Sequence, residues 1–229
     1  MRYFDLHCDT MTECAVKDIP LRENTLHVSL EQVKDWEHYV QCYAVWLPDD
    51  LRGEAAWQRF LQVAERFARE VGENAGSLEQ LRGPGDLDRL ERQGRHGAIL
   101  TVESGAVLGG KLERVQECKR LGVGMCTLTW NGATELGRGV MAPGSTGLTE
   151  FGRQAVKAME KAGIPLIEAE KTVIAEDFSE YEVRHPGVFG WLGLGDVPSL
   201  HNNKFDFDEE VMQTGINAFI GLLDYFEEK

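Results

Sequence analysis

The sequence lacks several patterns that would each define a class of protein. None of the five cysteines belongs to a CxxC pair, and their odd number and scattered positions suggest neither a disulfide framework nor a zinc ribbon. No apolar run approaches the roughly 20 residues that a membrane-spanning helix needs, and the first residues do not form a basic segment followed by an apolar one. We therefore expect a cytoplasmic protein with reduced thiols and no membrane partner.

Positive charge is also scarce. The chain has 24 Lys and Arg against 38 Asp and Glu, which gives a net charge of −14, and no basic cluster stands out. Because binding to nucleic acid depends on basic side chains that neutralise phosphates, we expect no nucleic-acid partner. Hydrophobic residues make up 42% of the 229 residues, which is enough to bury a substantial core.

What the sequence does contain is a repeated succession of strand and helix patterns. Apolar spacing predicts helices at 54–72, after Asp86, at 112–121, from residue 145 or 146 to 163, and from Asp208 through Phe226. Such repeated units favour an α/β fold with a parallel sheet, either open or curled into a barrel. Strands are predicted for "RYFDLHCD", "YVQCYAVWLP", "HGAILTVESG", "VGMCTLTWNG" and "IPLIEA".

The first predicted strand ends in an HxD pattern. Alternation along a strand would place His7 and Asp9 on one side and Cys8 on the other, at the carboxyl edge where α/β enzymes carry their sites. Glu103 ends another predicted strand in the same sense. An imidazole with carboxylates suits zinc, but the same pattern also marks a solvated strand end or a helix cap. The residues alone leave both interpretations open.

A resemblance extends the metal interpretation. The segments "FDLHCDT", "LTVESGAVLGGKLERVQECKRLGVGMCTLTWNGATELGRG" and "GLTEFGRQAVKAMEKAGIPLI" resemble the membrane (renal) dipeptidase family of zinc metallopeptidases over residues 1–167. The resemblance implies a TIM-like barrel and a two-zinc site that hydrolyses dipeptides by a two-metal hydroxide mechanism. His7 and Asp9 match the family's first ligands, and Glu103 matches its bridging glutamate, which makes Glu103 the candidate catalytic residue.

The sequence also departs from this family. In the family's next ligand motif, Glu168 stands at the position of an Asp and Lys171 at that of a His, and an ammonium group has no free lone pair for a metal. The family takes two further His ligands from later strands, and the second of them has no counterpart in this sequence. Trp130 stands where many members carry a substrate-binding His. We therefore expect one or two bound zinc ions, or none.

The C-terminal segment has a different resemblance. Residues 175–223 resemble the end of aminoacylase and carboxypeptidase-type amidohydrolases, in which the His that matches His201 is a metal ligand. The chain is thus expected to join a partial dipeptidase-like (β/α) barrel of about four to five βα units, residues 1–170, to an amidohydrolase-like segment, residues 171–229, that completes or caps it. Whether such a fusion is natural is open at this point.

Two functions follow as hypotheses. The first is a metal-dependent dipeptidase-like hydrolase with His7, Asp9, Glu103 and His201 as candidate ligands, impaired by the missing His residues. The second is a catalytically inactive fusion or remnant that acts as an interaction protein. Because half a barrel exposes sheet edges, homo-oligomers through those edges are expected under the second hypothesis.

Overall fold

A computed structural model of the protein describes residues 2–83, 85–139, 142–143, 147–164, 210–214, 216–217 and 220. The chain divides into two compact units, Met1–Leu166 and Ile167–Lys229. In the second unit, the described residues 210–214, 216, 217 and 220 are helical, within the region where the last helix is predicted. All other elements described below belong to the first unit.

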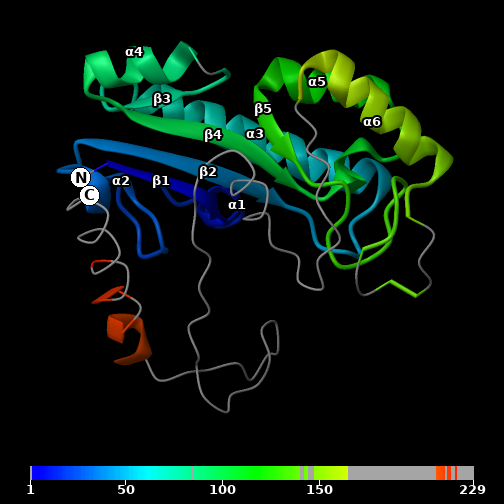
Figure 1. Ribbon diagram of the computed structural model, residues 1–229, viewed down its shortest axis with the longest axis horizontal. Helices are drawn as coiled ribbons and strands as arrows, with labels where there is room; N and C mark the ends of the chain where they lie inside the picture. The colour runs from blue at the N-terminus through cyan, green and yellow to red at the C-terminus, as the bar shows by residue number, and fades with distance from the viewer. Residues whose placement is uncertain are drawn as a thin grey trace, which may run out of the picture. The chain divides into compact units, whose positions relative to one another are not determined.

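The first unit contains a parallel sheet in the order β1-β2-β4-β3, with β5 also paired to β4. β3 and β5 share one side of β4 because β3 pairs with its start and β5 with its end (Figure 1). Among the described strands the sheet does not close, and β1 has a strand neighbour on one side only. The predicted α/β fold, an incomplete TIM-like barrel, is confirmed. The strands are β1 (Arg2–Cys8), β2 (His38–Trp46), β3 (Leu78–Gln80), β4 (His96–Glu103) and β5 (Val123–Cys126).

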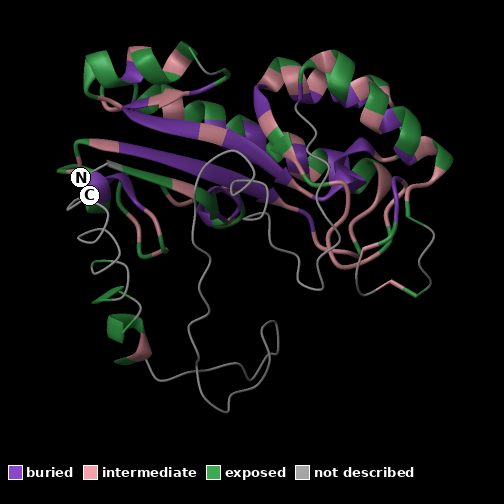
Figure 2. Ribbon diagram, in the orientation of Figure 1, coloured by how far each residue is buried: buried purple, intermediate pink, exposed green. Residues whose placement is uncertain are grey.

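Helices connect these strands and cover one face of the sheet. α1 and α3 contact each other and both contact β2, so they lie on the same face, and the main hydrophobic core is buried between them and the strands. β2 and β4 are buried along most of their length (Figure 2). The helices are α1 (Thr10–Lys17), α2 (Leu30–Val33), α3 (Gly53–Glu73), α4 (Gly85–Gln93), the 3₁₀ helix η1 (Gly105–Leu108), α5 (Glu113–Leu121) and α6 (Glu150–Ala162).

Several predicted boundaries were wrong. β5 ends at Cys126, whereas the apolar pattern predicted a strand through residue 132. α6 begins at Glu150 because Thr149, and not residue 145 or 146, caps it by accepting the Gly152 N–H. The predicted "IPLIEA" strand lies outside the described residues apart from Ile164.

A β-bulge in β1 decides which face His7 occupies. Asp5 pairs with Gln41 but Cys8 pairs with Tyr43, so β1 has one more residue than β2 over this stretch. Cys8 therefore shares the helix-covered face with Tyr43, and His7 lies on the opposite face. Glu103 belongs to that same opposite face, which we call the site face, because it pairs with Trp46 in the β2–β4 register.

Among the described residues, no helix combines the length and the apolar character needed to cross a membrane.

Candidate metal centre

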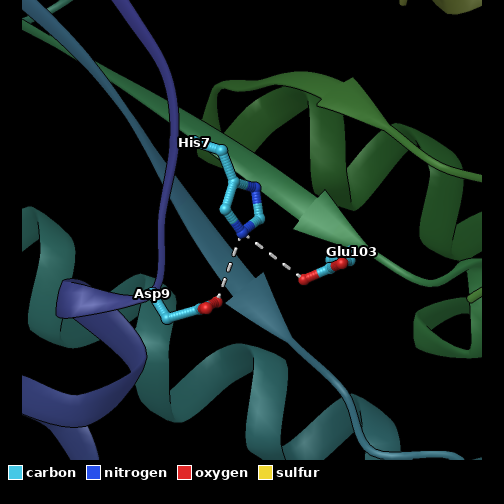
Figure 3. A group of neighbouring side chains, drawn as sticks. All are labelled: His7, Asp9 and Glu103. Atoms are coloured by element: carbon cyan, nitrogen blue, oxygen red, sulfur yellow. Dashed lines mark ion pairs between the residues drawn. The ribbon is translucent and has the colours of Figure 1, made fainter. Parts of the chain in front are cut away.

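His7, Asp9 and Glu103 converge at the carboxyl edge of the sheet. One ligand atom from each lies within 4.8 Å of the other two. His7 Nε2 is 3.7 Å from Asp9 Oδ1 and 3.8 Å from Glu103 Oε2 (Figure 3). The three side chains come from the end of β1, the residue before α1 and the end of β4, so segments almost 100 residues apart in the sequence supply one cluster.

Asp9 was predicted to lie on the first strand, on the same side as His7. In the structure it follows β1 and is the N-cap residue of α1. An Asp at this position usually caps the helix by accepting a hydrogen bond from its first turn. The Asp9 side chain makes no such hydrogen bond, and its carboxylate lies beside His7 instead. The helix-cap interpretation therefore does not explain this side chain.

The backbone directly after Glu103 has an unusual conformation that hydrogen bonds maintain. The next residue, Ser104, has a φ of 118°, which is rare for a residue other than glycine. Its N–H donates to Thr127 Oγ1 at 3.0 Å, and its hydroxyl accepts from the Ala106 N–H at 3.3 Å. Backbone strain of this kind often accompanies functional sites, where surrounding contacts must maintain it. Here those contacts fix the direction in which β4 presents Glu103.

The electrostatics of the cluster favour positive charge. The interaction with Asp9 raises the pKa of His7, burial partly opposes this effect, and Glu103 raises the pKa further. The side chains of His7 and Asp9 are half exposed, and that of Glu103 is 23% exposed. The donor set of one imidazole and two carboxylates fits a divalent cation reached from solvent, and three protein ligands are typical of catalytic zinc sites.

His201, Glu168 and Lys171 all lie outside the described residues. Within the described residues, the structure brings two further side chains to this edge. Trp130, which stands where many members of the dipeptidase family carry a substrate-binding His, contacts Trp46. Trp46 was not among the predicted site residues. The only signal for Trp46 was its place at the end of a predicted strand just before Pro48.

A parallel α/β sheet with an imidazole and two carboxylates at its carboxyl edge is typical of the metal-dependent hydrolases built on barrel-like folds. Comparison with known families specifies which of them this is. The family described as membrane dipeptidase (Peptidase family M19) matches residues 1–170, and the chain belongs to it.

Solved structures show the same fold. A dipeptidase of the M19 family, dipeptidase AC, superposes with a TM-score of 0.64 at 20% identity, over 72% of this chain and 55% of that one. A metallopeptidase from Rhodobacter sphaeroides, solved with a phosphinate mimic of the dipeptide L-Ala-D-Ala, gives the same TM-score and identity over 72% and 57%. The chain thus spans a little over half the length of these dipeptidases.

Curated relatives of another kind match a shorter part of the chain. N-acetyldiaminopimelate deacetylase of Bacillus velezensis is 32% identical over 77 residues, which is 34% of this chain and 20% of that protein. The enzyme of that name from Lactobacillus acidophilus is 39% identical over 61 residues, 26% of this chain and 16% of that protein. A fused amidohydrolase-like tail would produce such relatives, and the fusion stays a prediction.

Proposed function

We propose that this chain is a metal-dependent dipeptidase-like hydrolase that cleaves the peptide bond of a dipeptide. The observation that carries the proposal is the convergence of His7, Asp9 and Glu103 within 4.8 Å at the carboxyl edge of the sheet. Membership of the membrane dipeptidase family supports the reaction class. The dipeptide mimic bound by the Rhodobacter sphaeroides relative supports the substrate class.

We propose that the three residues together bind one ion and that this ion is zinc. His7 would ligate through Nε2, the atom that faces both carboxylates. Asp9 would ligate and also orient the imidazole, and Glu103 would ligate from the carboxyl end of β4, next to the reacting atoms. When bound, the ion would supply Lewis-acid polarisation of the scissile carbonyl.

A second ion would need further ligands. Those that the family takes from later strands would come from the segment that includes Lys171, and the tail offers His201, but neither position is among the described residues. Because Lys171 is a poor ligand at neutral pH, we propose a site with one ion and an activity below that of intact relatives.

The activity test uses the full chain supplied with zinc and the dipeptide L-Ala-L-Ala. We expect slow release of free alanine, and we expect Glu103→Ala to lower kcat/KM at least about 100-fold because the ion loses a ligand at the reacting centre. Glu31→Ala is the matched control, since Glu31 is an exposed carboxylate that pairs only locally with Lys34. Equal rates for Glu103→Ala and the unmodified chain would refute the proposal, as would no hydrolysis with any divalent metal.

A second candidate function, assembly through the edge of the sheet, is favoured by the surface of β1. Tyr3, Phe4 and Leu6 are 49%, 48% and 40% exposed, and apolar side chains on a strand edge promote pairing with another chain. If the chain dimerises through β1, Phe4→Lys should shift its mass in solution from dimer to monomer, as measured by light scattering. A monomeric unmodified chain would exclude this candidate.

A further inference from the structure

Two tryptophans lie beside the candidate metal centre. Trp46 is the last residue of β2 and pairs in register with Glu103, so the two side chains are neighbours on the site face. The rings of Trp46 and Trp130 meet edge to face, with centroids 5.6 Å apart and an interplanar angle of 79°. Both side chains are only partly buried. Part of each tryptophan thus remains accessible, and Trp46 lies beside the ligand candidate Glu103.

The loop that carries Trp130 is tied firmly to the loop after β2. The Gly132 N–H donates to Asp49 Oδ1 at 2.9 Å, and Arg52 Nη2 donates to the Ala133 carbonyl at 2.9 Å. A Cβ on Gly132 would come within 2.7 Å of the Asp49 carboxyl group, so a larger residue there would displace that group from its hydrogen bond. These contacts hold Trp130 against Trp46 across a sequence separation of more than 80 residues.

From this arrangement we infer that Trp46 and Trp130 form the wall of a substrate subsite that takes a large apolar side chain of the dipeptide. The inference rests on the proposed function and names a specificity for the same site. Indole rings offer broad apolar surface, and their only polar group is a donor. Asp9, Glu103 and Asp49 lie around the same edge, so acidic substrate side chains are disfavoured by like charge.

The test compares dipeptides that differ in one side chain. With the zinc-supplied full chain, we expect kcat/KM for L-Ala-L-Phe or L-Phe-L-Ala to exceed that for L-Ala-L-Ala by about 10-fold or more, the usual discrimination of an apolar pocket. Trp130→Ala should reduce this ratio to near 1, whereas Trp130→Phe should keep most of it. An unchanged ratio in Trp130→Ala would overturn the subsite even though hydrolysis persists.

Trp36→Ala is the matched control. Trp36 is also partly buried and also packs edge to face, but on Tyr39 near the amino end of β2. Tyr39 is seven residues before Trp46, which corresponds to about 23 Å along an extended strand. The ratio should be unaffected in this variant. Loss of the ratio in both variants would assign the effect to general destabilisation and would overturn the inference.

A binding measurement separates this inference from the proposed function. If no variant hydrolyses any dipeptide, the proposed function fails, and calorimetric titration of the zinc-supplied chain with L-Ala-L-Phe then decides the subsite. Binding that weakens about 10-fold in Trp130→Ala but not in Trp36→Ala supports the subsite without catalysis. Equal binding by the two variants, or no measurable binding to the unmodified chain, overturns it.

Discussion

The double substitution His7→Ala, Asp9→Ala is expected to abolish metal binding. The unmodified full chain, supplied with zinc and then dialysed, should retain about one ion per chain, as three converging ligands imply. Removing two of the three ligands leaves Glu103 alone, and a single carboxylate does not hold zinc against water. We expect the apparent affinity to fall by at least about 100-fold, since even the loss of a supporting contact costs 10- to 100-fold.

Elemental analysis of the purified protein measures this directly. The matched control is Glu37→Ala, His38→Ala, because His38 Nε2 and Glu37 Oε1 lie 3.6 Å apart at the start of β2, much like the His7–Asp9 pair. Among the described residues that pair does not form part of a three-ligand cluster. Metal retained by the His7, Asp9 variant, or metal lost equally from the control, would show that the ion binds elsewhere. Absence of metal from the unmodified chain would refute the site.

Glu70→Ala is expected to lower the free energy of unfolding by about 3–5 kcal/mol, the usual cost of removing one partner from a buried ion pair. The Glu70 side chain is 2% exposed and accepts hydrogen bonds from Arg66 Nε at 2.8 Å and from the Leu21 N–H at 3.0 Å. Arg66 also donates to the Ile19 carbonyl and contacts Asp18. This network fastens the segment after α1 to α3, and its loss leaves Arg66 and the Leu21 N–H without their buried acceptor.

Urea unfolding of the full chain, followed by circular dichroism, measures the change. Glu117→Ala serves as the control because Glu117 makes an exposed pair with Arg120 on α5, and such pairs contribute less than about 1 kcal/mol. Glu70→Gln should be less damaging than Glu70→Ala, since an amide oxygen can still accept the Leu21 N–H. A loss of stability in Glu70→Ala no larger than that in Glu117→Ala would show that the network is not needed.

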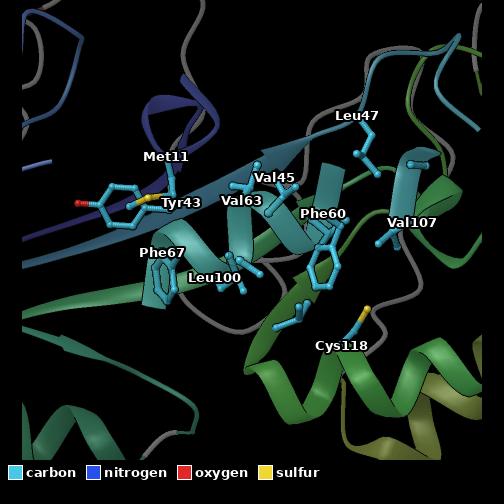
Figure 4. Packing of buried hydrophobic residues seen from close by; sticks show 14 of the residues in the cluster. Met11, Tyr43, Val45, Leu47, Phe60, Val63, Phe67, Leu100, Val107 and Cys118 are labelled. Atoms are coloured by element: carbon cyan, nitrogen blue, oxygen red, sulfur yellow. The ribbon is translucent and has the colours of Figure 1, made fainter. Parts of the chain in front are cut away.

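Strong helical periodicity made some elements predictable. The positions Phe60, Val63 and Phe67 recur at helical spacing, and all three are buried in the core by α3, as Figure 4 shows. α5 and α6 end at Gly122 and Gly163, where the helices were predicted to end, and both glycines have the left-handed conformation.

Other elements depend on contacts that a sequence does not display. β3 has three residues and exists as a strand because it pairs with the start of β4. α1 and α2 are short helices, which need tertiary packing to be stable, and the apolar spacing of the sequence did not predict them. In "VGMCTLTWNG", the apolar pattern continues beyond Cys126, but the chain leaves the sheet there.

The candidate site was predicted from residue type and resemblance, and only the structure explains its geometry. His7, Asp9 and Glu103 were identified together, yet Asp9 reaches His7 from a helix N-cap and not by strand alternation. The partnership of Trp46 with Trp130 links residues 84 positions apart, a contact that neither spacing nor composition could indicate.

The bulge in β1 makes the strand register of this segment as important as its composition. If β1 stayed in unbroken register after the Asp5–Gln41 pair, the imidazole would stand opposite Tyr43, on the face that packs against Met11 (Figure 4). Every ligand residue would still be present in the sequence, but the imidazole would lie in the hydrocarbon interior. The side chain of His7 therefore reaches the site face because Leu6 and His7 together stand opposite the single residue Cys42.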